Sequence, residues 1–203
     1  NDYVPRRGDL LPDGHNEPPR EVYLQSTSDG RMLLRFSATV TNIGAGPLEI
    51  DTSSPTRQWI RNSDGGERSI PMKGQWVADM HPEHSHTHLA DFQDFELRQL
   101  DEQGGVGPLV GRNSKVSFLV SDTEQRHLDM DPDGAMRVTR DQNMSFGLSG
   151  KSGFTSRGRQ GISRGWSDEY GAGITGQAID VTQAVNGAMY LYLRQTFDRN
   201  DRL

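Results

Sequence analysis

The most strongly patterned stretch of the chain reads Met32-Leu33-Leu34-Arg35-Phe36-Ser37-Ala38-Thr39-Val40-Thr41. Its even-numbered residues are apolar, whereas the odd-numbered residues from 35 onward are polar. Successive side chains of a strand point to opposite faces, so this alternation predicts a β-strand with one apolar face. The segment Asn42–Pro47 follows with two glycines and a proline, which predicts a turn. Leu48–Ile50 is expected to return as the next strand.

Further extended segments are predicted on both sides of this strand. They lie around Arg57–Arg61, within 84–100, and at Lys115–Val120, Ala178–Thr182 and Met189–Arg194. No segment shows helical spacing over three turns, and no repeat occurs at solenoid periods. The sequence therefore predicts an all-β chain with a β-sandwich core, long loops and little helix, with an open barrel as the alternative.

The length of 203 residues suits a single domain that covers residues 1–203. Residues 1–20 hold four of the ten prolines and predict an extended N-terminal segment. Residues 121–160 are rich in Gly, Ser, Arg and Asp with weak periodicity, which predicts a long loop or insertion.

The charge and hydropathy of the chain narrow the choice of partners. The formal net charge is −6, which disfavours a nucleic-acid partner and favours cationic ones at long range. No apolar stretch approaches the roughly 20 residues that a membrane-spanning helix needs, so no membrane span is expected. The chain has no cysteine, so disulfide pairing indicates no compartment.

Four of the six histidines fall within eight residues, in the segment His81-Pro82-Glu83-His84-Ser85-His86-Thr87-His88. If the segment is extended, His84, His86 and His88 project to one face and their imidazoles can converge on one ion. Three neutral imidazoles suit copper, zinc, nickel or iron, and copper binds most tightly in the first-row series. His81 is out of phase and is expected to be either a partner that orients a ligand imidazole or an outer ligand. The alternatives are a zinc site and a solvated histidine tract.

A second candidate metal site lies in the predicted loop. Asp129, Asp131 and Asp133 precede a glycine in the D-x-D-x-D-G form of a calcium loop. The bidentate glutamate that such loops carry at position twelve is absent, because Arg140 stands there. A solvated acidic turn is the alternative to calcium binding.

Three separate blocks resemble the lysyl oxidase family, in order and spacing, over most of residues 9–197. The histidine segment resembles the copper-binding stretch of that family. Lys115-Val116-Ser117-Phe118, followed by Asp122-Thr123, resembles the block whose lysine supplies half of the cofactor. Gly161-Ile162 and Asp168-Glu169-Tyr170, with Gln177–Thr182, resemble the block whose tyrosine supplies the other half.

The resemblance implies a copper-dependent amine oxidase that is secreted or extracellular. His84, His86 and His88 would bind copper, and Lys115 and Tyr170 would join as lysine tyrosylquinone. The reaction would convert a primary amine, either a protein lysine or a small amine, with molecular oxygen and water into an aldehyde, ammonia and hydrogen peroxide. Animal members of the family have disulfides and this chain has none, a departure that bears on stability more than on chemistry.

Such an oxidase needs a base that removes a proton from the carbon next to the substrate nitrogen. Asp168, Asp91 and His81 are the candidates by their proximity in sequence. Taken singly, each cofactor residue also has an ordinary structural interpretation. Lys115 alternates with the apolar residues that follow it, which is typical of a solvated lysine, and Tyr170 lies in a glycine-rich region where a packed ring is common. The alternative function is a non-catalytic copper- or zinc-binding β-sandwich module.

Overall fold

The fold is described by a computed structural model. It describes residues 4–51, 55–78, 87–113, 115, 117–126, 159–184 and 190–197. Strands make up the regular structure of these residues, their pairings are antiparallel, and no helix occurs among them. The predicted all-β fold is therefore confirmed.

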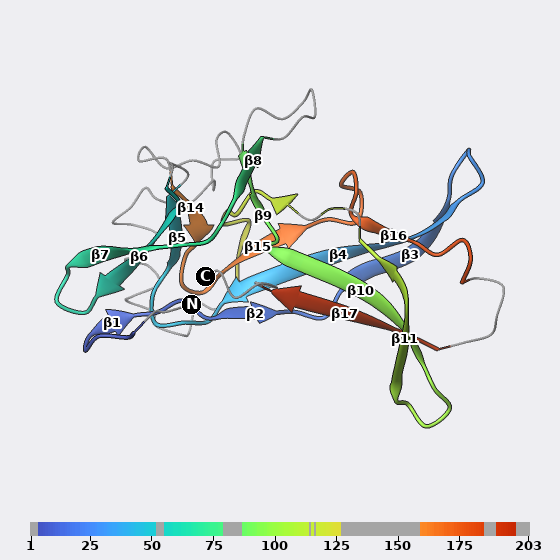
Figure 1. The fold of residues 1–203 in the computed structure, drawn as a ribbon, viewed down its shortest axis with the longest axis horizontal. Coiled ribbons are helices and arrows are strands. Elements are labelled where there is room, and N and C mark those ends of the chain that lie inside the picture. The colour runs from blue at the N-terminus through green and yellow to red at the C-terminus, as the bar shows by residue number, and fades with distance from the viewer. Residues whose placement is uncertain are drawn as a thin grey trace.

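The central strand is β4 (Met32–Asn42), the stretch whose alternation is strongest. β15 (Trp166–Tyr170) and β16 (Ala178–Asp180) lie along one edge of β4, and β2 (Gly14–Asn16) and β3 (Arg20–Ser26) lie along the other (Figure 1). β13 (Glu124–Gln125) extends this sheet beyond β15.

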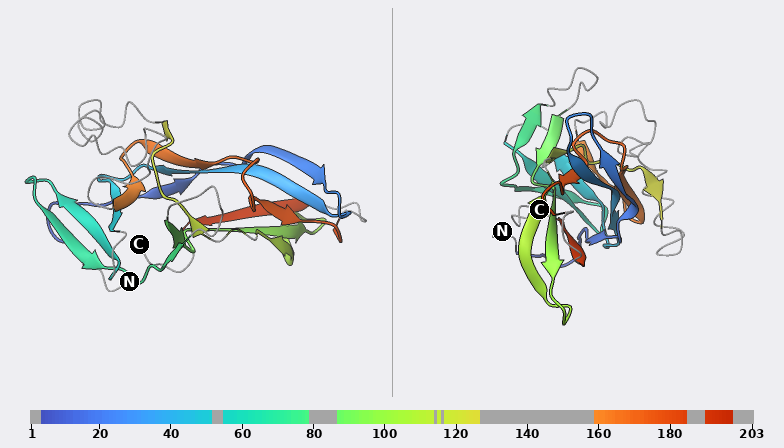
Figure 2. Two further views of the ribbon diagram at one scale, coloured as in Figure 1. Left: turned by 90° about the horizontal axis from the view of Figure 1, so that it is seen from above. Right: turned by 90° about the vertical axis from the view of Figure 1, so that its right-hand side faces the viewer.

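A second sheet faces the first one and completes the sandwich (Figure 2). Its middle strand is β10 (Gln93–Leu100), between β11 (Val106–Arg112) and β17 (Leu191–Phe197). Phe36 of β4 and Phe95 of β10 meet edge to face, with ring centroids 5.0 Å apart. Such pairs add to the energy of apolar burial, so this contact helps to lock the two layers together.

Two further sheets complete the described fold. One contains β1 (Asp9–Leu10), β6 (Arg57–Asn62), β5 (Leu48–Asp51) and β14 (Arg159–Ile162), with β7 (Glu67–Pro71) paired to β6. The other runs from β12 (Ser117–Phe118) through β9 (Thr87–Ala90) to β8 (Trp76–Ala78). These sheets lie at one end of the long sandwich (Figure 1).

Both faces of β4 are covered in its second half, although only one face is apolar. Phe36, Ala38 and Val40 are fully buried in the core, as the alternation predicts. On the other face Thr39 and Thr41 are also buried, because carboxylates bond to their hydroxyls. Thr41 donates to Glu17 at 2.5 Å, and the Thr39 hydroxyl donates to Glu169 at 3.4 Å.

The extended N-terminal segment is more ordered than the sequence indicates, because β1 and β2 form there and pair with β6 and β4. The predicted loop 121–160 begins and ends in strands, since β13 lies near its start and β14 overlaps its end. Two backbone hydrogen bonds close its base: Gly161 donates to Val120 at 3.0 Å, and Arg126 donates to Gly165 at 2.9 Å. Residues 127–158 lie outside the described residues.

In the part of the chain that the structure describes, no helix is long and apolar enough to span a membrane.

Candidate active site

The inner face of β15 carries the two residues that the third sequence block singles out. Asp168 pairs with Val40 and Tyr170 pairs with Ala38, so both side chains lie on the face of β15 that is turned to the core. Asp168 is 2% exposed and Tyr170 is 7% exposed. The glycine-rich sequence around Tyr170 does not predict a strand, but the tyrosine is the last residue of the paired strand β15.

The Tyr170 ring is held from two sides. It packs edge to face on Phe118, with ring centroids 4.6 Å apart and an interplanar angle of 78°. Its hydroxyl donates a hydrogen bond to the carbonyl of Leu119. Burial raises the pKa of Tyr170 well above its usual range, and the negative charge of Asp168 raises it further. The phenol is therefore neutral in the folded chain.

Lys115 lies over the same two rings. Its Nζ is 5.2 Å from the centroid of Phe118 and 6.0 Å from the centroid of Tyr170. An ammonium at such distances is attracted by the electron-rich ring faces. The backbone of Lys115 is fixed by Asn113, whose side-chain oxygen accepts a hydrogen bond from the Lys115 N–H at 3.2 Å. The alternation that favoured a solvated Lys115 is misleading, because the side chain is half-buried over the two rings.

Asp168 has the surroundings of a base with strong proton affinity. Burial raises its pKa well above the ordinary value, and the charge of Asp122 raises it further. Hydrogen bonding acts in the opposite direction: the Ser121 N–H donates to Oδ2 at 3.3 Å, and the Tyr170 hydroxyl, whose single proton is also directed at the Leu119 carbonyl, is the second partner. The net effect is a raised pKa of Asp168, because loss of solvent around the carboxyl is the largest influence on it.

His88 is the one histidine of the predicted copper site that the structure describes. It is buried on β9, and its Nδ1 lies 3.4 Å from the Ser117 hydroxyl. Because Ser117 pairs with Ala90 and Phe118 pairs with Leu89, His88 and Ser117 share one face of the β9–β12 ribbon. Phe118 and the Tyr170 ring lie on the other face. The structure thus pairs β9, which carries His88, with β12, which follows Lys115. The imidazole of His88 and the phenol of Tyr170 lie on opposite faces of this two-stranded ribbon.

Asp91 lies in the turn between β9 and β10 with a positive φ of 58°. Aspartate tolerates this left-handed conformation better than most residues, which gives it an ordinary structural role in the turn. The other predicted site residues fall outside the described residues: His81, His84, His86, Asp129, Asp131 and Asp133. Within the described ranges, no group of three His, Asp or Glu side chains is placed to hold a metal.

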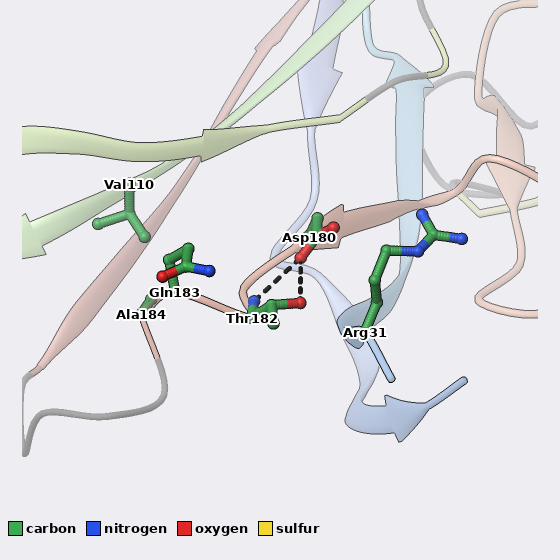
Figure 3. A pocket seen from close by; sticks show the side chains of 6 residues that line it. All are labelled: Arg31, Val110, Asp180, Thr182, Gln183 and Ala184. Atoms are coloured by element: carbon green, nitrogen blue, oxygen red, sulfur yellow. Dashed lines mark hydrogen bonds between the residues drawn. The ribbon is translucent and has the colours of Figure 1, made fainter. Parts of the chain in front are cut away.

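Two surface pockets lie away from the Lys115–Tyr170 pair. One of about 320 Å³ is bordered by Asp180, whose carboxylate accepts two hydrogen bonds from Thr182 (Figure 3). These bonds lower the pKa of Asp180. The other pocket, of about 190 Å³, lies on the outer face of the β4 sheet, with Glu169 in its wall. Neither pocket is lined by a residue of the proposed copper or quinone site.

The chain was compared with known proteins. No family model and no curated protein matches it.

The structure adds two residues, Asn113 and Asp122, whose contribution to the site the sequence did not predict. No sequence signal marks Asn113, since its contribution depends on a backbone contact two residues away and on a bond from its own N–H to Phe95. Asp122 is part of the second sequence block, but its proximity to Asp168 emerges only when the strands pair.

Proposed function

We propose that this chain is a copper-dependent amine oxidase of the lysyl oxidase type, which oxidises a protein lysine or small primary amine outside the cell. The observation that carries the proposal is the 6.0 Å between the Lys115 Nζ and the centroid of the Tyr170 ring. The two residues are far apart in sequence: Tyr170 belongs to β15, and Lys115 lies just before β12.

Lys115 must reach a carbon of the Tyr170 ring as an uncharged amine, which is the reactive form of lysine. Its four-carbon side chain is flexible, so a change of rotamer can move the nitrogen nearer to the ring. The Phe118 ring lies 5.2 Å from Nζ and helps to hold the lysine side chain over the Tyr170 ring. The quinone that results would supply the electron sink that no ordinary side chain offers.

Asp168 is the preferred base among the three candidates. It shares the inner face of β15 with Tyr170 and is shielded from solvent. A carboxyl with a raised pKa binds a proton more strongly, which suits it to receive the proton from the carbon next to the substrate nitrogen. Asp91 lies in a turn and has a structural reason for its position.

Copper would bind to His88 together with His84 and His86. His88 fits this role because its Nδ1 lies near a hydroxyl, the kind of outer contact that orients ligand imidazoles, and the metal would then bind through Nε2. Copper would activate oxygen for oxidation of the tyrosine ring. Calcium at Asp129, Asp131 and Asp133 remains a separate proposal from the sequence alone.

A non-catalytic copper- or zinc-binding module is the second candidate function. One observation favours it: His88 and Tyr170 lie on opposite faces of the β9–β12 ribbon. In such a module the histidines would bind metal, and the Lys115–Tyr170 pair would serve only packing.

Mass spectrometry of digested protein separates the two functions. After incubation with copper and air, an oxidase should yield one peptide that links the Lys115 and Tyr170 regions and reacts with a hydrazine. Tyr170→Phe should abolish that peptide, whereas Tyr23→Phe, at an exposed position of β3, should not. His88→Ala should abolish both copper binding and the link, while His15→Ala on β2 should preserve both. Copper binding without the link, and without hydrogen peroxide release from primary amines, would overturn the oxidase and leave the module.

A further inference from the structure

Two buried carboxylates belong to neighbouring segments near the proposed quinone. Asp168 on β15 and Asp122 on the segment before β13 are each 2% exposed. This segment is fastened along β15: Thr123 donates its N–H to the Ser167 carbonyl at 2.8 Å, and its hydroxyl accepts from the Glu169 N–H at 2.8 Å. Asp122 therefore has a fixed position relative to Asp168.

The two carboxylates are not equivalent. Asp122 accepts a hydrogen bond of 2.7 Å from the Ser163 N–H, whereas the N–H of Ser121 reaches Asp168 at 3.3 Å. A shorter bond from a backbone N–H stabilises a carboxylate anion more strongly. As the pH rises, Asp122 is therefore expected to lose its proton first, and Asp168 loses its proton at higher pH and is then the stronger base.

The other groups around Asp168 leave this asymmetry in place. On its own strand the neighbouring titratable group is Tyr170, which is neutral, and the facing residue of β4 is the apolar Val40. Lys115 lies over the Tyr170 ring. Glu169 and Arg126 belong to the outer face of β15 and pair there with each other.

We propose that Asp122 is a positioning residue that strengthens Asp168 as a base, because its negative charge opposes a second charge on the neighbouring carboxylate. The role in catalysis rests on the proposed amine oxidase function, whereas the coupling of the two carboxylates does not. In the proton transfer, the C–H bond next to the substrate nitrogen breaks and an O–H bond forms on Asp168. The electron pair of the C–H bond would pass to the quinone, which is reduced as the amine carbon is oxidised.

The coupling can be measured in the metal-free full-length chain by carbon-13 NMR titration of labelled aspartate carboxyls, with the Asp168 signal assigned from Asp168→Asn. Asp122→Asn should lower the Asp168 pKa by about one pH unit. Glu124→Gln, which removes an exposed carboxylate from the same segment, should leave it unchanged. An unaltered Asp168 titration in folded Asp122→Asn protein would overturn the proposal.

The wild-type titration provides an answer even if Asp122→Asn does not fold. Coupled carboxyls titrate in two steps that both signals report, whereas independent carboxyls titrate in one step each, and the second result would overturn the proposal. In copper-loaded, active enzyme, Asp122→Asn should also move the acidic limb of the kcat/KM profile to lower pH. Coupling without oxidase activity would refute the proposed function alone, and activity without coupling would refute this inference alone.

Discussion

The two faces of β15 hold carboxylates in opposite settings, although Asp168 and Glu169 are consecutive residues. Glu169 faces outward, where Arg20 bonds to it at 2.6 Å and Arg126 lies at 3.5 Å. Asp168 faces inward, where the Ser121 N–H donates to it at 3.3 Å and the neutral Tyr170 hydroxyl is its other hydrogen-bond partner among the described residues. The outer carboxylate is neutralised by cations, and the inner one lies beside a second acid.

We expect the ion-paired Glu169 to act in stability and the buried Asp168 to act in proton transfer. A structural ion pair lowers the energy of the folded chain, whereas a buried acid without a cation raises it and is retained where its proton affinity is used. The following experiments test whether Asp168 on the inner face and Glu169 on the outer face have these different roles.

The largest expected effect is on turnover. Asp168→Asn should lower kcat/KM for a primary amine by roughly 10²–10⁴-fold, the usual contribution of a general base, while quinone absorbance persists. Glu169→Gln is the matched control on the outer face and should keep nearly full activity. Equal losses in the two variants would contradict the assignment of the base to the inner face.

A smaller effect is expected on stability as a function of pH. Folding raises the pKa of Asp168, so the folded chain binds this proton more tightly than the unfolded chain does. The protonated carboxyl therefore contributes fully below the ordinary pKa of 3.8, and this stability is lost as the pH rises through the folded-state pKa. Since asparagine resembles the protonated acid, the Tm of Asp168→Asn should exceed that of wild type by an amount that grows from pH 4 to pH 8. A Tm difference that is constant over this range would contradict the raised pKa.

The smallest effect is expected on the outer face. Glu169→Gln should lower the free energy of unfolding by about 0–1 kcal/mol, because exposed ion pairs are weakened by solvent screening. Urea melts at low and high salt provide the measurement, and the loss should shrink in high salt. A loss of several kcal/mol would show that the outer carboxylate, too, is held in a solvent-excluded environment.

The sequence predicts the parts of this fold that alternate cleanly, and β4 is the clearest case. β15 was missed because Ser167, Asp168 and Glu169 are all polar, so no apolar face marks the strand before it pairs with β4. β11 was missed for a different reason, since Gly107 and Pro108 weaken the strand signal in its edge position. Both strands are recognisable only through their partners.

The candidate site shows the same limit. The chemical types at Lys115, Asp168 and Tyr170 could be selected from the sequence blocks, but their proximity depends on how two sheets pack. The alternation of residues 115–120 even predicted a solvated Lys115, because that prediction treats the whole segment as one regular strand. Which of the candidate bases is buried is likewise a tertiary property, and it separates Asp168 from Asp91 only in the folded chain.

The Lys115–Tyr170 contact has a mechanical consequence as well. Tyr170 belongs to the β4 sheet and Lys115 directly precedes the β12 sheet, about 55 residues away along the chain. A covalent link between them would act as a staple between sheets in a chain that has no cysteine to form one. Closing a loop of this length restricts the unfolded chain and is worth about 4 kcal/mol in the chain-entropy treatment of crosslinks. Formation of the cofactor would then also stabilise the fold. Protein that carries the crosslink should keep its higher melting temperature after copper has been removed by a chelator.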